Sequence, residues 1–289
     1  MKAPTEQWCV QIDVTNVCDM KCSNCTRVLA HVVVPFFMSL ETFERAVASV
    51  RTFPKASVPD VEGRKKVIGV IGGEPTLHPQ FTEICRIMEE LLPDKKTRGL
   101  WTNCGPKYKE HRVLIDRVFG YQNKQPHKPP VRHQPVLIAS RDAVKDKDKR
   151  LKLIYDCWLQ NSWASSITPR GVWYCEVAGA LDMVFQDTPG RLPIEPLWWN
   201  RSMLDFHDQI LHHCNRCGVC LPLPGRLDGD EMDDVSPTNL KRLEAIRSPG
   251  LARLFLHTMK GYNPAKYEET WSPRRYRDMK VGELIDGSL

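Results

Sequence analysis

Three cysteines near the start of the chain have the spacing of a metal-cluster site. Cys18, Cys22 and Cys25 form a CxxxCxxC motif that follows a strand-like, alternating run. Three thiolates can hold three irons of a 4Fe–4S cluster, which leaves the fourth iron without a protein ligand. An iron with an open position can bind a small molecule, whereas a cluster held by four cysteines mainly carries electrons. The motif therefore predicts a cluster that binds a ligand through iron.

Zinc and disulfides are the alternatives for closely spaced cysteines. Zinc needs a fourth ligand, which Cys9 or His31 could supply, so the spacing alone does not exclude it. Disulfides fit less well, because residues 1–7 are polar and form no apolar signal segment. We therefore expect a cytoplasmic protein whose cysteines stay reduced.

Composition narrows the function classes. The chain has 289 residues, enough for a large domain with an ample core. It has no apolar run of the roughly 20 residues needed to span a bilayer. A net charge of +6, from 41 basic and 35 acidic residues, permits an anionic substrate and does not favour nucleic acid. The basic stretches at 145–152 and 274–277 are explained equally well as solvated faces.

Strand and helix patterns alternate along the first half of the chain. Strands are expected over 8–15, 67–71, 99–102 and 135–140, and helices over 39–53, 80–92, 109–119 and 142–159. This alternation predicts βαβ units and a parallel sheet, whose ligands bind beyond the C-terminal ends of the strands. The polar and glycine motifs follow expected strand ends, so we expect one site there: the CxxxCxxC loop, Gly72-Gly73-Glu74-Pro75, Thr102-Asn103-Cys104 and Ser140-Arg141.

The cysteine motif followed by Gly72-Gly73-Glu74-Pro75 resembles the radical S-adenosylmethionine (radical SAM) enzymes. The resemblance implies an α/β fold, a partial (β/α)6 barrel of parallel strands with a small cysteine-rich C-terminal extension. It also implies that Cys18, Cys22 and Cys25 bind a 4Fe–4S cluster whose free iron chelates the amino and carboxylate groups of SAM. One departure is Asn24, which stands where these enzymes usually have an aromatic residue that packs on the adenine.

The resemblance implies further SAM contacts at the same edge. Gly72 and Gly73 would let the backbone approach SAM closely, and Glu74 would place a negative charge beside the methionyl amine. Thr102 and Asn103 stand where the family often has Thr-Asn-Gly near the ligand.

Three other residues at expected strand ends are candidates for the site. Ser140 and Arg141 could hold the ribose and the carboxylate of SAM, because arginine binds carboxylates bidentately; helix capping is the alternative for Ser140. Cys104 could return a hydrogen atom to a substrate radical, or it could be a packed turn residue.

A second group of cysteines lies in the C-terminal half. Cys214, Cys217 and Cys220 form a CxxCxxC motif, and Cys175 lies upstream. Four thiolates could close a zinc site or bind a second 4Fe–4S cluster. Beside the first motif, this group resembles the auxiliary-cluster extensions, SPASM and the shorter twitch type, of radical SAM enzymes. Cys85 and Cys157 are expected to be buried as small hydrophobic residues.

Together these features predict three regions: a radical SAM barrel over 1–160, an auxiliary-cluster region over 161–225 and a helical tail over 226–289 that packs on the barrel. The expected cofactors are SAM and two 4Fe–4S clusters, with a one-electron donor such as flavodoxin or ferredoxin. The expected substrate is a small molecule, such as a sugar, aminoglycoside or nucleoside of natural-product biosynthesis, and the reaction an epimerisation, decarboxylation or dehydrogenation. The alternatives are modification of a ribosomally made peptide and a non-catalytic zinc-binding protein.

Overall fold

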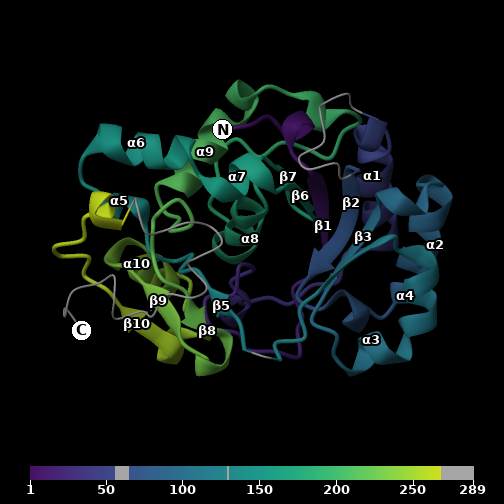
Figure 1. The fold of residues 1–289 in the computed structure, drawn as a ribbon, viewed down its shortest axis with the longest axis horizontal. Helices are drawn as coiled ribbons and strands as arrows, with labels where there is room; N and C mark the ends of the chain where they lie inside the picture. Colours follow the sequence, from purple (N-terminus) through teal and green to yellow (C-terminus); the bar gives the residue numbers. More distant parts are fainter. Residues whose placement is uncertain (56–64, 129, 268–289) are drawn as a thin grey trace.

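A six-stranded sheet forms the centre of the fold. The computed structural model describes residues 1–55, 65–128 and 130–267 (Figure 1). The sheet has the order β4-β3-β2-β1-β6-β7, and each neighbouring pair is parallel except the β6–β7 hairpin. Its strands are β1 (Cys9–Thr15), β2 (Val67–Gly72), β3 (Arg98–Thr102), β4 (Tyr121–Lys124), β6 (Ala164–Thr168) and β7 (Gly171–Trp173). A mixed α/β fold with a mostly parallel sheet is therefore confirmed.

Helices and two small sheets surround this centre. The helices are α1 (Leu40–Val50), α2 (Phe81–Leu91), α3 (Pro106–Glu110), α4 (Arg112–Val118), α5 (Ser140–Ala143), α6 (Lys147–Tyr155), α7 (Trp158–Ser162), α8 (Glu176–Phe185), α9 (His207–Cys214) and α10 (Pro237–Ala245). Two strand pairs complete the fold: β5 (Arg132–His133) with β8 (Arg226–Leu227), and β9 (Asp233–Val235) with β10 (Leu254–Leu256). Single turns of 3-10 helix include Leu29–His31, Pro75–Leu77, Asp228–Asp230 and Leu251–Arg253.

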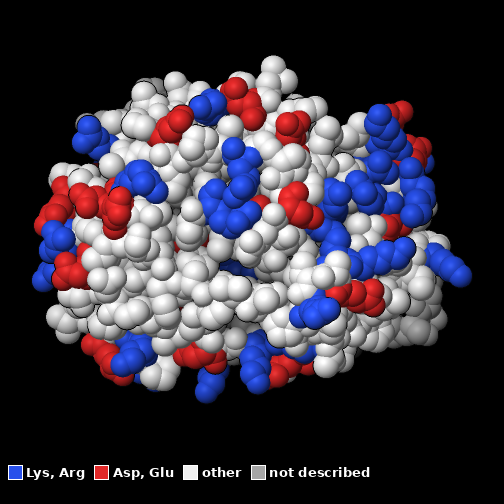
Figure 2. All heavy atoms as spheres, turned by 180° about the vertical axis from the view of Figure 1, so that it is seen from behind, with Lys and Arg blue, Asp and Glu red and all other residues white. Residues whose placement is uncertain are grey.

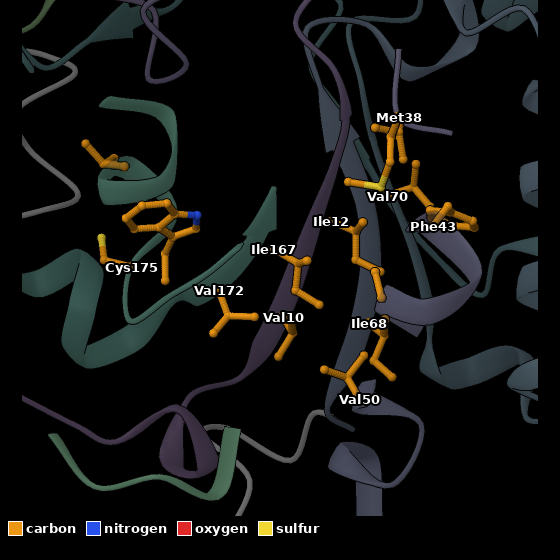
Figure 3. Close-up of a cluster of buried hydrophobic side chains, with 14 of the residues drawn as sticks. Val10, Ile12, Met38, Phe43, Val50, Ile68, Val70, Ile167, Val172 and Cys175 are labelled. Atoms are coloured by element: carbon orange, nitrogen blue, oxygen red, sulfur yellow. The ribbon is translucent and has the colours of Figure 1, made fainter. Parts of the chain in front are cut away.

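Alternate side chains of β1 point to opposite faces of the sheet. Val10 and Ile12 point into the main hydrophobic core, where they meet Ile68 and Val70 of β2 (Figure 3). Helix α1 closes this face with Phe43, and Ser39 caps the helix by accepting from the backbone N–H of Thr42. Burial of this apolar face anchors β1, so the loop that follows Thr15 starts from a fixed point.

The predicted strand over 135–140 is wrong. This segment is irregular and lies between the second cysteine loop and β9, where Val136 accepts from the N–H of Gly218 (3.0 Å) and Leu137 accepts from that of Ser236 (3.3 Å). Its apolar side chains are buried, but its backbone hydrogen bonds are made with loop residues and not with a neighbouring strand. Among the described residues, β4 is therefore an edge strand of the sheet, and β6 extends the sheet on its other side by pairing with β1.

Two predicted helices are divided. The helix expected over 142–159 consists of the end of α5, then α6, then α7; Asp146 caps α6 by accepting from the N–H groups of Asp148 and Lys149. Similarly, 109–119 contains the end of α3 and all of α4.

Beyond residue 225, the structure has the strands β8, β9 and β10 as well as the helix α10. The basic stretch at 274–277 lies outside the described residues. Figure 2 shows acidic and basic side chains together on the rear face. In the part of the chain that is described, every helix is too short or too polar to cross a bilayer.

Candidate functional site

The first cysteine motif lies in a loop at the C-terminal end of β1. Cys18, Cys22 and Cys25 are free thiols, and all three line one cavity of about 330 Å³ together with Met20 and Arg253. Burial raises the pKa of Cys18 and of Cys22 to about 12, and the neighbouring thiols add to the shift. The loop thus brings three thiols to one ligand-sized space, but a positively charged partner is needed to keep them ionised at neutral pH.

The two glycines at the end of β2 allow it to contact this loop. A Cβ on Gly72 would lie 2.1 Å from the carbonyl oxygen of Thr15, and one on Gly73 would lie 2.1 Å from that of Val17. The N–H of Gly73 donates to Thr15 (2.8 Å), and the N–H of Glu74 donates to Val17 (2.8 Å). The close approach that glycine permits here is therefore to the backbone of the cysteine loop.

The carboxylate of Glu74 joins the ends of β2 and β3. It accepts from the hydroxyl of Thr76 (2.6 Å), the hydroxyl of Thr102 (3.0 Å) and the N–H of Asn103 (2.7 Å). Burial raises its pKa, although these hydrogen bonds oppose the shift. The side-chain amide of Asn103 in turn donates to Asp19 (2.6 Å) and lies 3.8 Å from the sulfur of Cys18. Glu74 therefore orders the strand ends around the thiols, and both of its oxygens have protein partners.

Asn24, the departure from the family pattern, faces the C-terminal part of the chain. Its N–H donates to Asp233 (2.6 Å), its side-chain amide donates to Asp234 (2.7 Å), and its side-chain carbonyl accepts from the N–H of Asp234 (2.9 Å). Its φ of +47° is a left-handed conformation that asparagine tolerates. The residue therefore fastens the cysteine loop to β9.

The two aspartates of β9 are held by cationic side chains. Burial opposes ionisation of Asp234, but hydrogen bonds from His257, Arg226 and Asn24 outweigh it and lower its pKa to about 2. Arg253 lies 3.4 Å from Asp233 and donates to the carbonyl oxygens of Lys21 (2.9 Å) and Cys22 (3.2 Å). The segment after residue 225, for which the sequence indicated only helical packing, is therefore part of the site.

The second cysteine group surrounds a much smaller cavity, of about 20 Å³. Cys175 precedes α8, Cys214 ends α9, and Cys217 and Cys220 lie in the next loop. A fifth thiol, that of Cys157, lines the same cavity. Burial is the main cause of a raised pKa at all five thiols.

Cys157 was expected in the core as a small hydrophobic residue, and its place in this group is a correction. It comes directly before α7, at the break that divides the predicted helix, so it lies in a loop and not in the helix that the sequence predicted. Cys85, in contrast, is buried in α2 as expected. The hydroxyl of Tyr174 lies 2.9 Å from the sulfur of Cys214, which gives this thiol a polar partner within the protein.

A buried ion pair connects the two groups. Arg27, two residues after Cys25, forms an ion pair with Glu176 (2.8 Å), donates to its carbonyl oxygen (2.9 Å) and donates to the side chain of Gln11 (2.5 Å). Glu176 directly follows Cys175. Because both charges are buried, each needs the other to offset its loss of hydration.

The remaining candidates lie in two places. The hydroxyl of Ser140 donates to the carbonyl oxygen of Cys214 (2.7 Å), and the N–H of Arg141 donates to that of Asn215 (3.1 Å). Both residues are thus beside the second cysteine group, because the strand meant to carry them to the first does not form. Cys104 follows β3 at the first site with a left-handed φ of +60°, and burial raises its pKa.

One set of side chains that the sequence analysis missed could hold a single metal ion. Cys22, His127 and Asp228 have ligand atoms within 4.8 Å of one another, and among the described residues this is the set of three that meets this condition. Zinc would bring its sulfur ligands to about 3.8 Å from one another, given Zn–S bonds of about 2.3 Å. Among the described residues, neither cysteine group has three ligand atoms within 4.8 Å of one another.

Comparisons with known proteins give weak likenesses. No family model and no curated protein matches the chain. SuiB of Streptococcus suis, solved with S-adenosylmethionine bound, is 19% identical over 40% of this chain and 24% of its own, with a TM-score of 0.31. The chain thus matches about a quarter of the length of SuiB. BtrN, solved in complex with AdoMet and 2-DOIA, is 13% identical over 73% of this chain and 92% of its own, with a TM-score of 0.38.

Proposed function

We propose that the chain is a radical SAM enzyme. The observation that carries this proposal is the convergence of Cys18, Cys22 and Cys25 on one cavity at the C-terminal edge of a parallel sheet. These thiolates would hold a 4Fe–4S cluster and leave one iron free for the amino and carboxylate groups of SAM. When bound, the cluster and SAM supply a one-electron cleavage that yields methionine and a 5′-deoxyadenosyl radical, which abstracts hydrogen from the substrate.

The protein's own contribution is to hold the cysteine loop rigid. Gly73 and Glu74 fix its beginning through two backbone hydrogen bonds of 2.8 Å each. Asn24 and Arg253 fix its second half against β9. A loop held from both sides keeps its three thiols in place before a cofactor arrives, so the cost of ordering them is met during folding.

The second cysteine group serves as an electron-transfer site in this proposal. In it, an auxiliary 4Fe–4S cluster would be fully ligated by Cys175, Cys214, Cys217 and Cys220, and the thiol of Cys157 lines the same cavity. The cavity that they line has space for about one water molecule, so these thiols would have to move apart to take up the cluster. Such a cluster would exchange one electron with a substrate radical, and this favours dehydrogenation, decarboxylation or epimerisation.

The substrate in this proposal is a small molecule, for example a sugar, aminoglycoside or nucleoside of natural-product biosynthesis. The cavity beside the first motif, of about 330 Å³, has the size of a small-ligand site. A one-electron donor such as flavodoxin or ferredoxin would reduce the clusters. Eleven free cysteines suit a cytoplasmic, oxygen-sensitive protein.

Anaerobic reconstitution with iron and sulfide tests the proposal. The wild type should bind about eight irons, and a Cys18/Cys22/Cys25→Ala variant about four. Dithionite-driven formation of 5′-deoxyadenosine should be lost in that variant. Cys85→Ala is the matched control, because it removes a buried thiol of α2 that lies outside both groups. Zinc in place of iron, with no SAM cleavage by the wild type, would instead identify a structural metalloprotein.

A further inference from the structure

Three segments far apart in the sequence place a thiol, an imidazole and a carboxylate together. Nδ1 of His127 lies 4.0 Å from the sulfur of Cys22 and contacts a carboxylate oxygen of Asp228. Cys22 belongs to the cysteine loop, His127 follows β4, and Asp228 follows β8. The set shares a single residue with the three-cysteine motif, so it is a different combination of ligands around one thiol.

The backbone holds these three residues in this arrangement. The N–H of Ser23 donates to the carbonyl oxygen of Asp228 (2.9 Å), which fixes the carboxylate beside the cysteine loop. One carboxylate oxygen accepts from the N–H of Gly229 (2.9 Å), and the other is directed at His127. The side chains of His127 and Asp228 are only 9% and 5% exposed. A buried pair beside a thiol is thus prepared by contacts that do not depend on a cluster.

The donor set suits a divalent transition metal. A thiolate and a carboxylate would neutralise an ion of charge +2, and a neutral imidazole adds a third ligand of the kind that zinc, iron and cobalt accept. In a tetrahedral zinc site the sulfur and the nitrogen lie about 3.5 Å apart. The observed 4.0 Å between Cys22 and His127 is close to this value, whereas the imidazole of His127 and the carboxylate of Asp228, which contact each other directly, would have to separate to bind the ion. The cavity next to Cys22 leaves space for a water as the fourth ligand.

We propose that Cys22, His127 and Asp228 bind one divalent transition-metal ion when the first cluster is absent. Because the thiolate of Cys22 cannot bind both the ion and the first cluster, the two exclude each other, and this exclusion rests on the proposed function. Zinc at this site therefore blocks assembly of the first cluster and leaves the second group free to form its own.

Cobalt binding to the cluster-free protein, under anaerobic conditions, is the first test. Wild-type protein should bind one more equivalent of Co²⁺ than His127→Ala or Asp228→Asn, and this equivalent should carry the thiolate-to-cobalt absorption of a site with one sulfur. Cys18→Ser, the matched control in the same loop, should bind as much as wild type. His127→Cys keeps a metal ligand and should retain the equivalent, which separates ligation from folding.

Cobalt that is lost in Cys18→Ser but kept in both His127→Ala and Asp228→Asn would overturn the proposal, because the ion would then occupy the three-cysteine set. A second arm loads the protein with Zn²⁺ before reconstitution. Wild type should lose about four irons more than His127→Ala, because zinc bound at the second group displaces the same iron from both proteins; equal losses would contradict mutual exclusion. If neither wild type nor the variants form an iron cluster, the proposed function is wrong. Cobalt binding still tests whether Cys22, His127 and Asp228 form a metal site.

Discussion

The two cysteine groups use the same ligand and differ in the space around it. The first lies on a strand-end loop beside a cavity of about 330 Å³, and the second lies at the ends of α7, α8 and α9 around about 20 Å³. The first has three thiols, and the second has more thiols than a fully ligated cluster needs. In the proposed enzyme, an open metal position would therefore depend on the surrounding fold as much as on the number of cysteines.

The elements explain why the cavities differ. A loop between parallel strand ends cannot be covered by its own sheet, so space remains above it. Helix ends packed against one another leave only the gaps between side chains, and apolar residues such as Leu181 and Val219 fill those around the second group. We therefore expect ligand binding at the first group and electron transfer at the second.

Removing one thiol from each group should separate these two roles most strongly. Cys22→Ala should abolish SAM cleavage, because only two cysteines would remain to ligate the first cluster. Cys217→Ala should keep formation of 5′-deoxyadenosine and lose completed substrate turnover. Both are measured by product analysis after anaerobic reconstitution. Loss of SAM cleavage in Cys217→Ala, with iron still present at the first group, would remove the division of roles.

Breaking the ion pair between the groups should have the largest effect on stability. Arg27→Met leaves the buried carboxylates of Glu176 and Asp13 without their cation, and we expect the free energy of unfolding to fall by about 3–5 kcal/mol. Arg86→Met is the control, since its ion pairs with Glu83 and Glu90 are exposed and screened by solvent, so that its loss should be much smaller. Urea unfolding of both variants tests the difference, and similar losses would contradict it.

A methyl group at the glycine turn should disturb the first group alone. In Gly73→Ala the added carbon would lie 2.1 Å from the carbonyl oxygen of Val17, and overpacking of this kind costs about 1–3 kcal/mol. Iron at the first group should fall, and iron at the second should not change. Gly229→Ala is the matched control, because its added carbon meets nothing within 4 Å. Iron analysis and thermal unfolding distinguish the two variants.

The smallest expected effect is a dependence of stability on acid pH. The pKa of Asp234 is about 2 in the fold, below its ordinary value of 3.8, so its ionised form stabilises the folded state. This contribution, about 2 kcal/mol, is present above pH 4 and is lost as the pH falls from about 4 to about 2. Asp234→Asn should have lower stability at neutral pH and a flatter profile over this window. An unchanged profile would show that β9 docks without this charge.

The sequence alone predicted those parts of the site whose residues lie close together in the chain. The spacing of Cys18, Cys22 and Cys25, with an alternating strand before them, places the loop at a sheet edge, and the structure has it there. Gly72 and Gly73 were also found from the sequence, but their partner was not. Their close contact is with the backbone of residues 15–17, and no local pattern encodes that partner.

Sequence patterns failed where long-range packing decides the structure. The apolar run at 135–140 is buried between loops, and periodicity cannot distinguish this from a buried strand. Cys157 was assigned to a helix that in fact stops two residues before it. His127 and Asp228 are 101 residues apart, so only the fold brings them to Cys22.

The ion pair of Arg27 with Glu176 also bears on how the chain could be divided or recombined. A chimera that takes residues 161–225 from another protein would need an acid at position 176, or it would leave the buried Arg27 with only its longer ion pair to Asp13 (3.6 Å). A fragment that ends before residue 170 would meet the same difficulty. The two cysteine regions therefore share a buried ion pair, and an exchange between proteins would have to carry this pair along with the cysteines.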